Sequence, residues 1–219
     1  MMTDDLFSDA PGFAEPLWIG THAVLLRRFA LDLADRLLGD IGQIALAAPW
    51  RHMVTPGGQS MSVATTSCGD LGWVSDARGY RYVHDDPLSQ RPWPPIPRHW
   101  LDLAANACSA SGLFTGCAPP DACLINRYSP GTRLSLHQDR DERDFSVPII
   151  SVSLGVSARF MWGGLTRSER HRTIPLEHGD VLLWGGEDRL RFHGVMPVAE
   201  GYHPRTEAFR YNITMRRAG

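Results

Sequence analysis

The stretch that decides the fold is Val147-Pro148-Ile149-Ile150-Ser151-Val152-Ser153-Leu154-Gly155, in which most residues favour β-structure. A nearly continuous run of this kind is typical of a strand buried in a core. Further short runs lie on both sides of it, separated by glycines or by a Pro-Gly pair: 122–128, 158–162, 171–176, 181–184, 190–194 and 208–216. Several short strands at such close spacing predict a β-sandwich or a barrel in the C-terminal half.

The N-terminal half has a different texture. Apolar residues recur at helical spacing over residues 29–46 and predict a helix that ends before Pro49. Residues 50–94 are rich in Gly, Ser and aromatic residues, which predicts short strands and loops. The proline-rich segment 92–97 interrupts regular structure, and we expect a second helix over about 98–111. The prediction is therefore an α+β fold, with the 219 residues in a single domain.

The composition limits what the protein can be. With 43% hydrophobic residues the chain can bury a core, which excludes wholesale disorder. No apolar run reaches the roughly 18 residues of a membrane-spanning helix, and residues 1–5 are acidic where a secretory signal is basic. The four cysteines form no CxxC pair and are expected to be reduced. The net charge of −2 gives no global basic field, and all 22 basic residues are arginine. We expect a cytoplasmic monomer without membrane contact.

The sequence His137-Gln138-Asp139 is the first candidate for chemistry. Alternate residues on a strand point the same way, so this imidazole and this carboxylate would converge on one ion. Two other His-x-acid spacings are predicted to be structural: His84-Asp85-Asp86-Pro87 as an exposed loop and His178-Gly179-Asp180 as a tight turn. His137 differs because a strand and turn over 126–131 precede it and the β-rich run 147–155 follows it.

A second histidine would complete a facial triad of two histidines and one carboxylate, which leaves positions open for oxygen and a co-substrate. His193 is the best candidate, since Leu190-Arg191-Phe192-His193-Gly194 alternates as a strand should. His171 and His203 fit less well because charged and turn residues flank them.

The segment 210–216 carries the second signal. With period two, one face of this strand presents Arg210, Asn212, Thr214 and Arg216. Two arginines that point into a small barrel are costly unless an anion meets them. A dicarboxylate co-substrate would do so through bidentate contacts. An ordinary strand with a solvated polar face explains the pattern equally well.

Together these pieces resemble the AlkB family of Fe(II)- and 2-oxoglutarate-dependent dioxygenases. The similarity covers nearly the whole chain beyond about residue 16, and the pieces are specific in their order and spacing. They are Met61-Ser62-Val63-Ala64, Leu71-Gly72-Trp73, Pro92-Trp93-Pro94, Asn126-Arg127-Tyr128, His137-Gln138-Asp139 with Asp141-Glu142, Gly163-Gly164-Leu165, Leu176-Glu177-His178-Gly179-Asp180, Trp184-Gly185-Gly186, His193-Gly194 and Arg210-Tyr211-Asn212 through Arg216.

The resemblance implies a double-stranded β-helix (jelly-roll) core over about residues 120–217. It also implies an N-terminal extension with helices and a nucleotide-recognition lid over about residues 16–95. The implied iron ligands are His137, Asp139 and His193. The implied 2-oxoglutarate contacts are Arg210, Tyr128 and Asn212 at the distal carboxylate, with Asn126 and Arg216 at the end nearer the metal.

The substrate implied by the resemblance is a damaged base, taken out of its stack and clamped between aromatic rings. Trp73 matches the stacking residue, with the His137 ring on the other side, and Tyr80 lines the lid. Asp141 matches the acidic residue that reads the exocyclic amine of the base. Arg167 matches a residue that helps to hold the substrate strand.

The implied function is oxidative demethylation of N-alkylated bases, such as 1-methyladenine and 3-methylcytosine, in single- or double-stranded DNA or in RNA. Fe(II) would be the cofactor, 2-oxoglutarate and O₂ the co-substrates, and formaldehyde, succinate and CO₂ the products. Two alternatives stay open: a 2-oxoglutarate dioxygenase with a non-nucleic-acid substrate, and a damage-binding module with a vestigial oxygenase site. A purely structural β-sandwich is a remote third.

Overall fold

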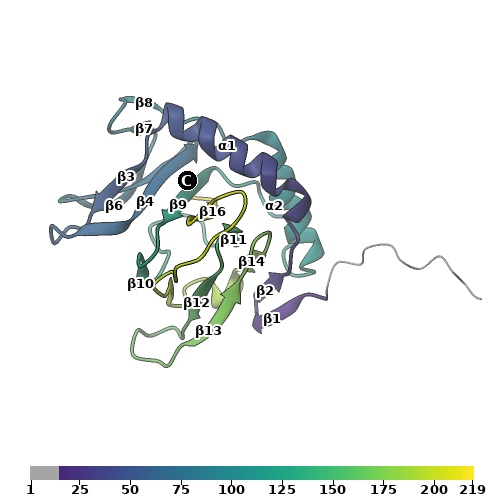
Figure 1. Cartoon of the computed structure of the whole chain (residues 1–219). Helices are drawn as coiled ribbons and strands as arrows, with labels where there is room; N and C mark the ends of the chain where they lie inside the picture. Colours follow the sequence, from purple (N-terminus) through teal and green to yellow (C-terminus); the bar gives the residue numbers. More distant parts are fainter. Residues whose placement is uncertain (1–14) are drawn as a thin grey trace, which may run out of the picture.

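The computed structural model describes residues 15–219 and has an α+β fold (Figure 1). Within this part of the chain, the helices are α1 (Ala34–Ala47) and α2 (Arg98–Ala110), with 3-10 turns at Leu31–Leu33 and Gly186–Asp188. The strands before α2 are β1 (Leu17–Gly20), β2 (Ala23–Leu26), β3 (Arg51–Val54), β4 (Ser60–Gly69), β5 (Gly72–Asp76), β6 (Gly79–Val83), β7 (Asp85–Asp86) and β8 (Arg91–Pro92). The strands after it are β9 (Ala122–Tyr128), β10 (Leu134–His137), β11 (Ile149–Gly155), β12 (Ala158–Trp162), β13 (Arg172–Leu176), β14 (Val181–Trp184), β15 (His193–Val195) and β16 (Arg210–Arg216).

Most strands belong to two antiparallel sheets. The larger sheet has eight strands in the order β1-β2-β14-β11-β16-β9-β4-β3. The smaller sheet has four strands in the order β10-β15-β12-β13. Strands β5 and β6 pair as a hairpin beside the larger sheet, and β7 pairs with β8 (Figure 1).

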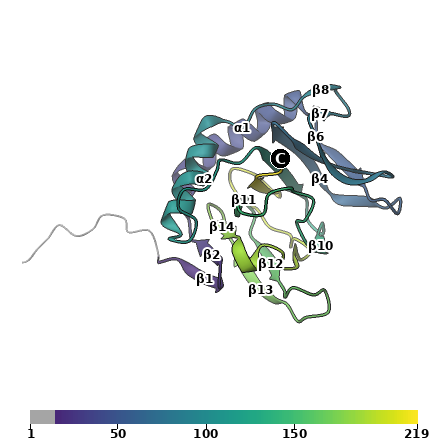
Figure 2. The same ribbon diagram turned by 180° about the vertical axis from the view of Figure 1, so that it is seen from behind.

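The larger sheet buries both of its faces. Helices α1 and α2 lie across one face (Figures 1 and 2), where Leu37 and Trp100 pack with Ile150, Val152 and other sheet residues. On the other face, the apolar side chains of the smaller sheet complete a second core cluster; its members include Tyr128, Ile149, Phe160, Trp162, Leu176 and Trp184. The run that starts at Ile149 is therefore fully buried as β11, as its composition predicts.

The sequence predicts most of the elements after residue 97. Strands β9, β12 and β14 have the predicted bounds, and β11 begins one residue after Pro148, which has no N–H to donate to a neighbouring strand. The second helix begins directly after Pro97, whose φ of −57° suits a helix start. The first predicted helix, 29–46, is a 3-10 turn at Leu31–Leu33 followed by α1.

Three predictions about local structure are wrong. The run 190–194 is a strand only from His193, because residues 189–190 form a turn and β15 spans His193–Val195. The segment 84–87 is not a fully exposed loop, because Asp86 is 1% exposed and forms an ion pair with Arg51. The strand that carries His137 ends at that residue, so Asp139 lies in an irregular loop over residues 138–148. Strands β1 and β2 were not predicted.

Other predictions concern the chain as a whole. All four cysteines are free thiols, as predicted, and three of them are buried. No helix among residues 15–219 is long and apolar enough to cross a membrane. The acidic segment 1–5 lies outside the described residues.

Candidate active site

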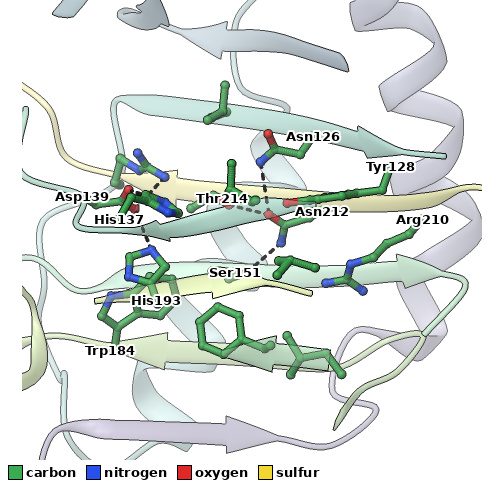
Figure 3. A pocket seen from close by; sticks show the side chains of 17 residues that line it. Asn126, Tyr128, His137, Asp139, Ser151, Trp184, His193, Arg210, Asn212 and Thr214 are labelled. Atoms are coloured by element: carbon green, nitrogen blue, oxygen red, sulfur yellow. Dashed lines mark hydrogen bonds and ion pairs between the residues drawn. The ribbon is translucent and has the colours of Figure 1, made fainter. Parts of the chain in front are cut away.

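A polar pocket lies between the two sheets (Figure 3). Strands β9 and β16 line it with alternate residues, and β11 adds Ser151. Strand β16 contributes Arg210, Asn212, Thr214 and Arg216, whereas Ile213 and Met215 belong to the core cluster under the helices. The pocket-lining residues of β9 are Leu124, Asn126 and Tyr128. The polar face predicted for 210–216 is therefore buried and is not a solvated strand face. Because side chains alternate along a strand, the polar residues of β16 face the pocket on one side of the larger sheet and its apolar residues pack against the helices on the other.

Three potential metal ligands meet at one end of this pocket. His137 ends β10, Asp139 follows it in the loop, and His193 begins β15, which pairs with β10 so that the two histidines are cross-strand partners. The Nε2 atom of His137 lies 3.5 Å from Asp139 Oδ1, and the Nε2 atom of His193 lies 3.8 Å from Oδ2. The ligand atoms of the three residues all lie within 4.8 Å of one another. This is the donor set of an iron(II) facial triad, with room for further ligands.

Both imidazoles are oriented by the same local contact. His137 Nδ1 lies 2.9 Å from the carbonyl of Ser135, and His193 Nδ1 lies 2.9 Å from the carbonyl of Arg191. A carbonyl oxygen only accepts, so each Nδ1 carries a proton, and in the neutral ring Nε2 presents its lone pair. Such contacts fix the tautomer that metal binding requires.

The electrostatics keep Asp139 ionised. Burial opposes its charge, but Arg216 Nη2 lies 3.0 Å from Oδ2, and the pKa of Asp139 is held well below its usual value. Burial, with the neighbouring His137, lowers the pKa of His193 to about 4. At neutral pH the site therefore offers one carboxylate and a neutral His193, which suits a divalent cation.

At the other end of the pocket lies an arginine without an anion. Arg210 is 1% exposed; its Nη2 donates to Ser153 Oγ at 3.0 Å, while Nε and Nη1 have no partner among the described residues. Burial lowers its pKa, yet an arginine stays protonated. Because an unpaired buried guanidinium is costly, this end is built for a carboxylate that no residue in 15–219 supplies.

Between these ends the pocket wall is a network of neutral polar groups. Asn212 Nδ2 donates to Ser151 Oγ at 2.7 Å, and Asn212 Oδ1 accepts from Thr214 at 2.8 Å and from Asn126 at 3.4 Å (Figure 3). Burial raises the pKa of the nearby Tyr128 phenol to about 12, so this ring stays neutral. A metal end, a polar wall and a cationic end together match a dicarboxylic 2-oxo acid: the oxo acid can chelate the metal and the distal carboxylate can pair with Arg210.

Three of the residues predicted to contact a base are Trp73 on β5, Tyr80 on β6 and Asp141 on the loop that follows β10. Trp73 stacks on Tyr80, with ring centroids 5.6 Å apart and planes at 11°. The indole N–H of Trp73 donates to Asp141 Oδ2 at 2.9 Å. Asp141 is exposed and lies two residues after Asp139, so this pair borders the candidate metal site.

Arg167 lies beside the same region. Its Nη1 donates to the carbonyl of Leu136 at 2.6 Å, and its guanidinium lies 5.0 Å from the centroid of the Phe192 ring. Leu136 and Phe192 directly precede the two histidines of the triad. Arg167 is exposed.

Three further residues around the triad were not assigned a role from the sequence. Arg189 and Glu142 are buried and contact each other, and Tyr82, from the β5–β6 hairpin, bonds to Glu142. Tyr82 lies 60 positions from Glu142 and 134 positions from Arg216 in the sequence. Contacts over such separations cannot be predicted from the spacing of residues in the sequence. No local pattern sets Arg189 apart, because it follows the 3-10 turn Gly186–Asp188 among other polar residues.

The pocket defines a class of protein. A facial triad beside a buried polar wall and an unpaired arginine fits an iron(II)- and 2-oxoglutarate-dependent oxygenase. Residues 23–216 match the 2OG-Fe(II) oxygenase superfamily.

Individual relatives show which family within this superfamily the chain belongs to. The chain is 54% identical over 214 residues to the alpha-ketoglutarate-dependent dioxygenase AlkB of Salmonella typhimurium, covering 98% of this chain and 97% of the relative. It is 52% identical over 215 residues to AlkB of Escherichia coli, with 98% of both chains covered. The solved structure of OsALKBH1 is similar at a TM-score of 0.82 and 26% identity, over 92% of this chain and 99% of that one. The chain therefore belongs to the AlkB family, as its motifs predict.

Proposed function

We propose that this protein removes N-linked alkyl groups from bases of the 1-methyladenine and 3-methylcytosine type in DNA, by direct oxidative reversal of the damage. The observation that carries the proposal is the hydrogen bond from Trp73 to Asp141 beside the candidate metal site. An aromatic face and a carboxylate acceptor together suit a flat base with an exocyclic amine. Relatives include proteins named as a DNA N(6)-methyladenine demethylase and a tRNA demethylase, so RNA is the nearest alternative substrate.

The proposed roles follow the geometry. His137, Asp139 and His193 would hold Fe(II), and 2-oxoglutarate would lie along the polar wall with one carboxylate at Arg210. When bound, these groups supply the oxidation, in which O₂ is consumed, 2-oxoglutarate yields succinate and CO₂, and the methyl group leaves as formaldehyde.

The side chains supply position and a dry environment. Tyr128 and Asn212 would contact the distal carboxylate with Arg210, and Asn126 and Arg216 would contact the end nearer the metal. The buried wall excludes water, which strengthens each of these contacts.

At the mouth, Trp73 would stack on the flipped base while its N–H holds one oxygen of Asp141. The other carboxylate oxygen is then left for the exocyclic amine of the base. Tyr80 would line the lid formed by the β5–β6 hairpin, and Arg167 would contact the phosphate backbone.

We also propose that residues 120–217 form a jelly roll within a single domain. Its support is the alternation of strands between sheets, since β9, β11, β14 and β16 belong to the larger sheet and β10, β12, β13 and β15 to the smaller one. The lid and N-terminal extension would occupy residues 16–95. Action as a monomer in the cytoplasm completes the proposal, and the four free thiols are consistent with a reducing compartment.

The test is an aerobic assay with Fe(II), ascorbate, 2-oxoglutarate and an oligonucleotide that carries one 1-methyladenine. Mass spectrometry would follow methyl loss and succinate together, with the unmethylated oligonucleotide as control. Methyl loss matched by succinate is the expected result. Succinate without methyl loss would keep the oxygenase and replace the substrate. Neither product from iron-loaded protein would favour the damage-binding module instead.

A further inference from the structure

Beneath the candidate metal site lies a cluster of four buried ionic side chains. These are Asp139, Glu142, Arg189 and Arg216, with side-chain exposures of 10%, 0%, 2% and 6%. Two carboxylates and two guanidiniums balance in charge, which lowers the cost of burying them. The proposed roles above use Asp139 and Arg216 but give none to Glu142 or Arg189.

The donors of Arg216 are divided among its neighbours. Nη2 lies 3.0 Å from Asp139 Oδ2. Nη1 lies 3.2 Å from Glu142 Oε1 and 3.0 Å from the hydroxyl of Tyr82. Nε is buried and has no partner among the described residues. One donor of this guanidinium therefore remains for an anion in the pocket.

Glu142 is itself held from two sides. The Tyr82 hydroxyl donates to Oε1 at 2.7 Å, and Arg189 Nη2 lies 3.3 Å from Oε2. Arg189 Nη1 also donates to the backbone carbonyl of Asp139 at 2.6 Å. Because residues 138–148 contain no helix or strand, such side-chain contacts fix the loop that carries the metal ligand.

We infer that Glu142 is a positioning residue, which holds Arg216 so that one nitrogen reaches Asp139 and Nε stays open to 2-oxoglutarate. A guanidinium beside a carboxylate favours a bidentate pair. Without Glu142, Arg216 is free to take both oxygens of Asp139, which would compete with the metal and withdraw Nε from the co-substrate. The inference rests on the proposed contact between Arg216 and 2-oxoglutarate.

The same contacts connect this cluster to the β5–β6 hairpin. Trp73 and Tyr82 are directly paired across the hairpin and bond to the consecutive residues Asp141 and Glu142. Tyr82 is thus an uncharged partner of two members of the cluster, Glu142 and Arg216. Replacing it removes one hydrogen bond from Glu142 and one from Arg216 without altering the buried charge.

The experiment compares Glu142→Gln and Tyr82→Phe with the wild type and with two matched controls at exposed positions, Glu200→Gln and Tyr202→Phe. Binding of 2-oxoglutarate to the Mn(II)-loaded protein is titrated without nucleic acid, by quenching of tryptophan fluorescence. Loss of a hydrogen bond to a charged group corresponds to roughly tenfold in affinity. We expect the Kd of 2-oxoglutarate to rise about tenfold in Glu142→Gln and about threefold in Tyr82→Phe.

Two further readouts separate positioning from mere stability. At saturating Fe(II) and saturating 2-oxoglutarate, kcat for succinate formation should change less than about threefold, because the weaker binding of both is then overcome. In the metal-free protein, amide exchange over residues 138–146 should be faster in both variants than in the controls.

A Kd within about twofold of the wild type in both variants, with lowered thermal midpoints, would mean a structural role only and would overturn the inference. If Glu142→Gln does not fold, Tyr82→Phe decides the question, because it changes no charge. Since the titration contains no nucleic acid, failure of the methylated oligonucleotide as a substrate would leave this result untouched.

Discussion

Asp141 is the residue at which the proposed basis of substrate choice can be tested most directly. Its carboxylate accepts the indole N–H of Trp73, so the loss of Asp141 would remove both the proposed base contact and a restraint on the Trp73 ring. We expect Asp141→Ala to slow methylated-base repair by roughly 10- to 100-fold, as for a charged hydrogen bond. Succinate formation without oligonucleotide should change by less than about threefold.

The matched control is Asp144→Ala, on the same loop, where the carboxylate bonds Ser146 at 2.6 and 2.8 Å. Both rates are measured by mass spectrometry on the same preparations. Equal losses of repair and of uncoupled succinate formation in Asp141→Ala would remove its role in reading the base.

His178 gives the molecule a sensitivity to acid at a position away from the metal site. Its Nδ1 accepts the backbone N–H of Gly155 at 2.9 Å, and burial, with the neighbouring His203, lowers its pKa below 6.5. The folded state therefore favours the neutral ring, so this stability is complete above pH 6.5 and is lost as pH falls through the lowered pKa.

His178→Asn keeps an acceptor near the same position but cannot be protonated. Between pH 7.5 and pH 5.5, the thermal midpoint of the wild type should fall by about 2–4 °C more than that of this variant. This difference corresponds to the loss of one hydrogen bond in a chain of this size. Thermal melts at pH 7.5 and 5.5 measure the difference. Identical pH profiles would show that the Gly155 contact does not titrate.

Some residues of the site followed from the sequence because they lie in short motifs. His137 and Asp139 are two positions apart, and β16 carries four pocket residues at period two, so local spacing revealed them. Glu142 and Arg189 could not be found this way. Their partners meet only after folding joins the hairpin, the loop and β16, and a lone charge in sequence does not show whether it will be buried.

Helix α1 contains two glycines that lower its stability. Gly39 and Gly42 lie inside it, are exposed, and have nothing within 4 Å of an added Cβ atom. Glycine within a helix costs about 0.5–1 kcal/mol relative to alanine. We expect Gly39→Ala and Gly42→Ala each to raise the thermal midpoint by about 1–4 °C, without change in turnover.

The contrasting variant is Gly58→Ala, in the β3–β4 turn, which has equal space but a φ of +81°. There an added side chain is strained by about 1–2 kcal/mol, so the midpoint should fall. Differential scanning calorimetry on the three variants measures both signs. A loss of stability in the helix variants would mean that Gly39 and Gly42 are needed where they lie, and would contradict the view that only the buried face of α1 makes contacts.

Helices and strands were predicted correctly where the residues that begin or end them lie next to them in the sequence. Strands β12 and β14 are bounded by glycines or turn residues, and α2 follows a proline. Strands β1 and β2 were missed because each has four residues and little pattern. They become strands because β2 pairs with β14, which lies more than 150 positions away, and long-range pairing of this kind leaves no local signature.

The whole molecule should respond to its metal and co-substrate, because the triad and Arg210 join strands from both sheets. A ligand at 100 times its Kd stabilises the folded state by about 2.7 kcal/mol. In a chain of this size this corresponds to a rise of about 5–10 °C in thermal midpoint. We expect Mn(II) with 2-oxoglutarate to produce this shift under nitrogen, and EDTA to reverse it.

Asp139→Ala serves as the control, since it removes a ligand and should lose most of the shift. Differential scanning fluorimetry with each component alone and with both together separates the two contributions. A full shift in Asp139→Ala would place the metal elsewhere on the protein.

The period-two arrangement of β16 has a consequence for the genetics of this protein. Even-numbered positions from 210 to 216 line the pocket, whereas positions 213 and 215 belong to the core under the helices. A scan of substitutions along the strand should therefore alternate in phenotype with the parity of the residue number. Even positions would yield abundant protein that fails to repair, and odd positions would yield scarce protein that repairs normally per molecule. Abundance and activity, measured side by side, would thus show which face of the sheet each side chain occupies.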